Sequence, residues 1–172
     1  MEVDMMKRHL LFAGIIGLAT FGSWYAAWSA DDAALIKALG GAKVSLQKGL
    51  TASQQEGQPI SAKFELEDGK LQLSVYTAKD GKYSEVIVDH ATGKVAKSEP
   101  ITEGDDLTHA KSQSAAMAKA KIQLKDAVDK ATRAESGSRA VSVTPEAKGG
   151  HSVASIELLK GTKLQTVTQQ LD

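Results

Sequence analysis

The sequence predicts an α+β fold in which a helix packs on a three-stranded antiparallel β-meander, with this unit repeated twice along the chain. The first observation is a set of three runs of alternating apolar and polar residues within residues 60–95, separated by Asp-Gly pairs. The second is a weaker series of the same kind, which comes after a helical pattern near the C-terminus. Alternation with period two is typical of strands with one buried face.

The first meander is the clearer of the two. Ile60–Leu66 places apolar residues at alternate positions, and the run Leu71–Val75 repeats the pattern. Asp68-Gly69 separates these runs, and Asp80-Gly81 leads into a third run, Tyr83–Asp89. Asp-Gly suits a tight type I′ turn, where both central residues need positive φ. The pattern therefore predicts three antiparallel strands joined by two hairpins.

The third run ends in Asp89, a short turn, Gly93 and Lys94. A helix and three antiparallel strands closing on this motif resemble the PepSY domain family, named for peptidase propeptides and the YpeB spore protein. The resemblance implies that Asp89 and Gly93 shape the turn rather than catalyse a reaction. It also implies an exported domain that associates with peptidases or other envelope proteins, as an inhibitor or a folding-assisting pro-region. We expect two tandem copies.

Residues 1–29 have the pattern of a secretory signal peptide. Lys7-Arg8 supply a basic region, the apolar run Leu10–Gly22 comes next, and the best cleavage site precedes Ala30. We therefore expect an exported bacterial protein, periplasmic or secreted. The alternative is a retained membrane anchor through residues 10–28, although the apolar run is shorter than the ~20 residues that a spanning helix needs.

Apolar residues ahead of the first meander recur at helical spacing: Leu35, Leu39, Ala42, Leu46 and Leu50. Gly40-Gly41 should interrupt this pattern, which predicts one helix over Asp31–Leu39 and a second over Leu46–Gln55. Ser45 can cap the second helix, because its hydroxyl can accept a free backbone N–H. The first PepSY-like domain is thus expected to span residues 30–98.

A linker is predicted next, over Ser98–Asp106, because it contains Pro100 and a run of charged residues. Thr108 would then cap a single helix over His109–Ala134. This helix opens a second, divergent PepSY-like domain, expected over residues 107–172.

The second sheet has weaker signals than the first. Its expected strands and turns are Ala140–Val143, Gly149-Gly150, Val153–Leu159, Gly161 and Lys163–Gln169. Residues 42–46 align with residues 120–124, which supports an internal duplication. However, Pro145 predicts that the first strand of this half is short or at an edge. The half also lacks the Asp-x-x-x-Gly turn, so its family assignment has less support.

The composition excludes several classes of function. The sequence has no cysteine, so disulfide bonds, thiolate catalysis and cysteine-ligated zinc are excluded. Basic and acidic residues number 21 each, giving a formal net charge of zero. Such a balance does not favour a nucleic-acid partner or a polybasic membrane surface.

No residues with catalytic or metal-binding spacing emerge. His9 lies in the predicted signal peptide, and His90, His109 and His151 lack metal-ligand spacing. No serine elbow, Ser-x-x-Lys pair or phosphate loop is found. Glu65 and Glu67 are predicted, with Lys63, to form a solvated sheet face, and a catalytic role would need burial to shift their pKa. We expect no enzyme activity, no catalytic residues, no cofactor and no metal site.

The expected function is that of an exported, non-catalytic PepSY-domain protein that binds or inhibits a peptidase or another envelope protein. An unpaired strand edge could bind an extended peptide, although charged residues on the strands would discourage it. The alternative is a ligand- or metal-sensing periplasmic binding protein. That alternative predicts a cavity between the two halves lined by His90, His109 or His151.

Overall fold

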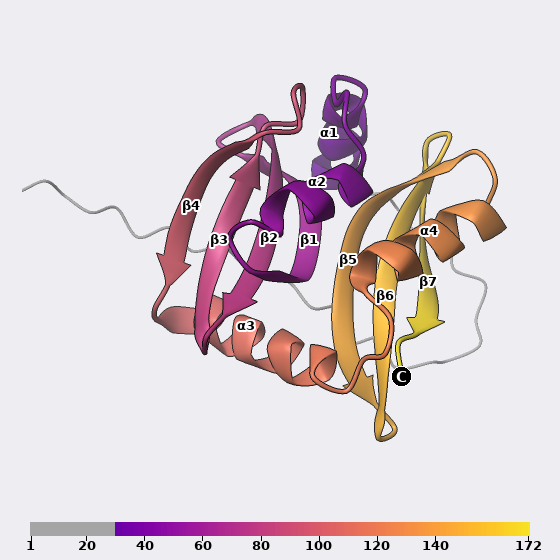
Figure 1. The fold of residues 1–172 in the computed structure, drawn as a ribbon. Helices are drawn as coiled ribbons and strands as arrows, with labels where there is room; N and C mark the ends of the chain where they lie inside the picture. The colour runs from indigo at the N-terminus through magenta and orange to yellow at the C-terminus, as the bar shows by residue number, and fades with distance from the viewer. Residues whose placement is uncertain (1–29) are drawn as a thin grey trace, which may run out of the picture.

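The computed structural model describes residues 30–172, which form four helices and one seven-stranded antiparallel sheet (Figure 1). The predicted signal peptide lies outside the described residues. The strand order is β4-β3-β2-β1-β5-β6-β7. The elements are α1 (Ala30–Leu39), α2 (Leu46–Ser53), β1 (Gln58–Glu67), β2 (Lys70–Lys79), β3 (Lys82–Val88), β4 (Val95–Ile101), α3 (Gly104–Met117), α4 (Leu124–Ala134), β5 (Ser138–Lys148), β6 (His151–Lys160) and β7 (Lys163–Gln170).

The predicted fold class, a helix on a three-stranded meander repeated twice, is wrong. The two halves share a continuous sheet, because β1 pairs with β5 through Ala62↔Val143 and Lys63↔Ser142. Each half also begins with two helices, and the first half has a fourth strand, β4, where a linker was expected. Pairing β1 with β5 removes two exposed edges that separate meanders would leave.

The hairpins of the first half form as predicted. Asp68 and Gly69 both have positive φ, 50° and 73°, and Asp80 and Gly81 repeat this with 51° and 74°. These angles suit the type I′ turn, which matches the twist of the flanking strands. The register then places Glu67 opposite Lys70, so the apolar residues of β1 and β2 share one face.

The helices of the first half also match the sequence pattern closely. Ser45 is the N-cap of α2 and its hydroxyl accepts a hydrogen bond of 3.2 Å from the Lys48 amide. The single helix predicted over His109–Ala134 is wrong, because α3 and α4 are separated by residues 118–123. Thr108 is not a cap; α3 begins at Gly104, and the Thr108 hydroxyl donates to the Gly104 carbonyl.

The break between α3 and α4 has a tertiary cause that repeats in both halves. The segment between the two helices of each half donates two amides to one carbonyl just after the third strand of that half. The bonds are Lys43 N and Val44 N to His90 O, and Lys121 N and Ile122 N to Leu171 O. In a helix through residues 118–123, these amides would bond within the helix and could not reach the Leu171 carbonyl. The tertiary hydrogen bonds therefore outweigh the helix propensity of this segment. The alignment of residues 42–46 with 120–124 is thereby confirmed, since α2 and α4 begin at Leu46 and Leu124.

Pro145 does not make β5 a short or edge strand. β5 has 11 residues and lies inside the sheet. In an antiparallel ladder, hydrogen-bonded pairs alternate with non-bonded pairs. The Lys148↔His151 pair closes a two-residue hairpin and is hydrogen-bonded, so Pro145↔Ala154, three positions along, is a non-bonded pair. The Pro145 nitrogen therefore points away from β6, toward β1. The pairing of β5 with β1 ends at Val143, so no ladder bond is lost there.

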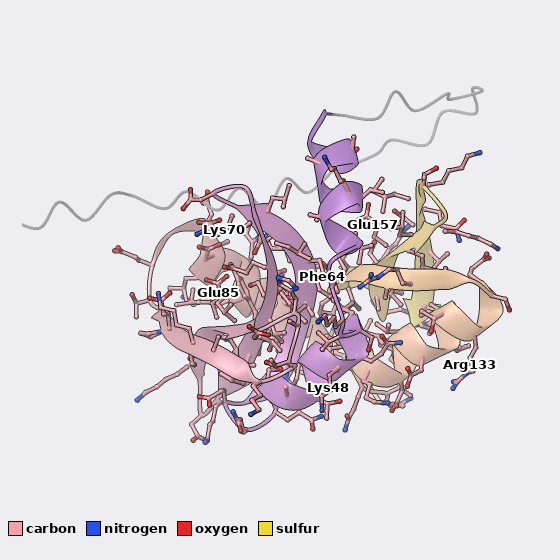
Figure 2. All side chains as sticks on the ribbon, turned by 90° about the horizontal axis from the view of Figure 1, so that it is seen from above. Lys48, Phe64, Lys70, Glu85, Arg133 and Glu157 are labelled. Atoms are coloured by element: carbon pink, nitrogen blue, oxygen red, sulfur yellow. The ribbon has the colours of Figure 1, made fainter. Side chains whose placement is uncertain are left out.

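The core lies between the sheet and the helices α2 and α4, which cover the same face (Figure 1). Leu46, Leu50, Leu124 and Val128 from these helices are buried. In the view from above, α1 stands on the opposite side of β5 from α2 (Figure 2). α3 runs across the lower ends of the strands in Figure 1. The two halves therefore contribute to one core and lean on each other.

Candidate functional site

The outer edge of β7 is a long strand edge that no described strand covers. β7 ends the strand order, and Figure 1 shows it at the margin of the sheet. The Leu171 amide donates to the Ser152 carbonyl, so Leu171↔Ser152 is a bonded pair. Because bonded pairs alternate with non-bonded ones, the backbone groups that point outward belong to Leu164, Thr166, Thr168 and Gln170.

The residues along this edge favour strand pairing. Between Lys163 and Asp172 the sequence has no charge and no proline, and it contains Thr166, Val167 and Thr168. β-branched residues are favoured in strands, and edges that resist pairing are blunted by charge, proline or bulges. After its first residue, Lys163, β7 has none of these devices.

The opposite edge, β4, is protected. Pro100 has no N–H, and it pairs opposite Ser84 at a position where that group would point outward. Lys97 and Glu99 form an ion pair of 2.7 Å, and the β3–β4 pairing is interrupted between Ile87 and Val88. The sheet therefore has one protected edge and one open edge.

A cavity of about 300 Å³ lies where the two halves meet. It is lined by α2, the start of β1, the end of β2, the end of α3 and the start of α4. Its lining residues are Leu50, Gln54, Gly57, Gln58, Pro59, Lys79, Met117, Gln123, Leu124 and Lys125. None of the histidines that were expected to line a cavity between the halves is among them.

The histidines do not converge. His90 lies in the turn after β3, where its carbonyl accepts two amides. His151 is the first residue of β6, and its Nδ1 is 3.1 Å from the Oδ2 of Asp172, which follows β7. His109 is in α3. Among residues 30–172, no group of three or more histidines, aspartates and glutamates is placed to hold a metal ion.

Asp89 and Gly93 form the turn that the family resemblance implied. The Asp89 Oδ1 accepts the amides of Ala91 and Thr92 and the Thr92 hydroxyl. These bonds, that of the Thr92 amide above all, lower the pKa of Asp89 because they stabilise its ionised form. Gly93 has φ 73°, and a Cβ there would lie 3.1 Å from Lys48 Cε. Both residues are engaged in holding the turn against α2.

The polar face of β1 and β2 is less solvated than predicted. The side chains of Lys63 and Glu65 are only 18% and 16% exposed, and the Lys63 Nζ lies 2.5 Å from the Glu65 Oε2. Burial raises the pKa of Glu65, and the attraction of Lys63 only partly opposes it. Next to this pair, the Ser74 hydroxyl donates to the Glu85 carboxylate at 2.7 Å.

This polar face does not form a nucleophile-and-base site. Ser74 bonds to a carboxylate rather than to an imidazole, and none of the described histidines lies beside it in the strand register. Tyr76 donates to Asp106 of α3 at 2.8 Å, and burial, together with this bond, raises its pKa. The bond ties the start of α3 to the sheet, which is a structural role.

Comparison with known proteins adds no relative to this picture. The chain matches no family model, no curated protein and no solved structure. Within residues 30–172, no helix has the length and apolarity required to cross a bilayer. Within residues 30–172, the open edge of β7 and the cavity between the halves are both suited to binding. The sequence predicts an unpaired strand edge and a cavity between the halves, but it identifies neither β7 nor the residues that line the cavity, because an edge depends on which strands are neighbours and the cavity draws residues from five elements.

Proposed function

We propose that this chain is an exported, non-catalytic binding protein of the PepSY type, which binds an extended segment of a peptidase or another envelope protein along β7. The observation that carries the proposal is the open edge of β7. The outward amides and carbonyls of Thr166 and Thr168 can form a bonded ladder with an added strand. The resemblance at Asp89 and Gly93 supports the class of partner.

The edge favours a neutral, extended partner segment. Backbone bonds supply affinity in strand addition, and side-chain contacts on alternate positions supply specificity. Val167 is partly buried against the core, and an added strand would extend this apolar surface. Lys163 and Asp172 flank the edge, so charges of opposite sign at the two ends of the segment would fix its direction.

A pull-down from the bacterial envelope fraction tests the proposal. The protein is produced from the full sequence, with a tag joined after Asp172 by a flexible linker, and retained proteins are identified by mass spectrometry. Thr168→Pro removes an outward N–H without removing a bond to β6, so it blocks the edge and preserves the sheet. Ser98→Pro is the matched control, because it makes the same change at an outward position of β4.

The expected result is a peptidase or another envelope protein that is retained by the parent and by Ser98→Pro, and lost with Thr168→Pro. Equal retention by Thr168→Pro would overturn the assignment to β7. If nothing is retained and light scattering shows a dimer that Thr168→Pro dissociates, the occupant of the edge is a second copy of the chain and the proposal fails. Circular dichroism verifies that each variant is folded.

The second candidate function is that of a ligand-sensing periplasmic binding protein. The cavity where the two halves meet supports it, because small-ligand sites favour such junctions. The metal-sensing form has less support, since residues 30–172 contain no candidate ligand cluster. The two candidates differ in the surface used: one needs the edge of β7, and the other needs the cavity.

A further inference from the structure

We infer that the cavity between the halves binds a small molecule or chain end in which a carboxylate is joined to an apolar group. This inference deepens the second candidate function, on which it rests, and does not involve β7. At about 300 Å³ the cavity lies at the lower end of the roughly 300–1,000 Å³ found for small-ligand sites. It therefore suits a short acyl chain or one or two apolar residues.

The interior of the cavity is apolar and is contributed by both halves. Leu50 of α2 and Leu124 of α4 are almost fully buried, and Met117 at the end of α3 is 7% exposed. Methionine is flexible and adapts to ligands of different shape. Pro59 adds a further apolar surface from β1. These buried side chains give the cavity an apolar wall, against which the apolar group of a ligand can pack.

The polar part of the lining favours an anion. Lys79 at the end of β2 and Lys125 in the first turn of α4 both line the cavity, and none of the described lining residues is acidic. Lys125 is paired with Asp129 at 2.7 Å, which leaves Lys79 as the main cation for a ligand to neutralise. The amides of Gln54, Gln58 and Gln123 can hydrogen-bond to a carboxylate.

The start of α4 adds to this preference through a difference between the halves. Ser45, the N-cap of α2, uses its hydroxyl to cap its own helix. Gln123 holds the same place before α4 but makes no side-chain cap bond, and it lines the cavity instead. The first N–H groups of α4 thus contribute a partial positive charge beside the two lysines.

Isothermal titration calorimetry with the full-length protein tests the inference. The probes are octanoate, octanol, and the dipeptide acetyl-Leu-Leu with a free or an amidated C-terminus. The variant is Lys79→Met, and Lys82→Met is its matched control on the same hairpin, because Lys82 does not line this cavity. Thr168→Pro is titrated as well, to separate the cavity from the β7 edge.

We expect octanoate or the free-acid dipeptide to bind, with octanol and the amide weaker. Lys79→Met should weaken binding about tenfold, as expected for loss of a charged hydrogen bond, and Lys82→Met should not. Preference for octanoate over the dipeptide identifies a fatty acid as the natural class, and the reverse identifies a peptide C-terminus. Absence of binding at millimolar concentration, or equal binding of octanol and octanoate, would overturn the inference. Thr168→Pro should bind like the parent, so failure here leaves the β7 proposal untouched.

Discussion

The two halves of the molecule are built alike but differ at their outer strand: β4 covers β3 in the first half, whereas β7 is left open in the second. In both halves, the amides between the two helices dock on a carbonyl just after the third strand, His90 in one and Leu171 in the other. After His90 the chain completes the Asp89–Gly93 turn and returns as β4, which covers β3. After Leu171 no described strand returns, and β7 stays open. The same unit can therefore be closed or available for binding, depending on whether a fourth strand covers its third.

The largest expected effect is a loss of stability when a proline is placed in β7 at a position that donates to β6. Val167 pairs opposite Ile156 in a bonded pair, so Val167→Pro removes a ladder donor and leaves a carbonyl of β6 unpaired. We expect it to lower the free energy of unfolding by about 3 kcal/mol in urea denaturation. Thr168→Pro, one residue further, should cost less than about 1 kcal/mol because its N–H points outward. Equal costs would show that the register of β7 is wrong.

Removing the charges and the proline that protect β4 should make this edge able to pair with another strand, as proposed for β7. The triple variant Lys97→Thr, Glu99→Thr and Pro100→Thr removes the ion pair and restores an outward N–H. We expect a concentration-dependent increase in mass by analytical ultracentrifugation, beyond that of the parent. A variant with the same mass as the parent at all concentrations would mean that another feature protects this edge.

Asp89→Ala tests the turn that leads into β4. The variant loses the acceptor for three hydrogen bonds, so we expect a lower melting temperature, by less than for Val167→Pro. Because the pKa of Asp89 is lowered in the fold, its contribution is present above its ordinary pKa and is lost as pH falls through the folded pKa. The difference between parent and variant should therefore shrink in acid. A difference independent of pH would contradict this role.

The smallest effect is expected for Glu65→Gln on the polar sheet face. The pKa of Glu65 is raised by burial, so ionisation opposes folding, and its penalty disappears as pH falls through the folded pKa toward the ordinary value. Glu65→Gln should flatten this part of the curve of unfolding free energy against pH and cause little loss at neutral pH. If the curve of unfolding free energy against pH is the same in the variant and the parent, its slope arises from other carboxylates.

Local features of the fold could be predicted from the sequence. The Asp68-Gly69 and Asp80-Gly81 turns and the Ser45 cap each depend on a few neighbouring residues. Such signals are complete within a short window of sequence.

Features that depend on distant residues could not be predicted. β4 looked like a linker because the charges and proline that protect an edge strand also typify loops. Alternation showed that Lys63 and Glu65 share a face, but not that this face would be so little exposed. The break after α3 depends on the Leu171 carbonyl, which is 50 positions from Lys121 and 49 from Ile122.

The short contact between β1 and β5 also bears on how the chain folds. Every other neighbouring pair of strands is consecutive along the chain, so these pairs can form after closing only a short loop. Ala62 and Val143, in contrast, are 81 positions apart in the sequence, so their pairing closes a much longer loop. Contacts between distant residues are slow to form, so the joining of β1 to β5 is expected to limit the folding rate. Until β1 and β5 pair, each is the edge strand of its own half and is exposed to aggregation.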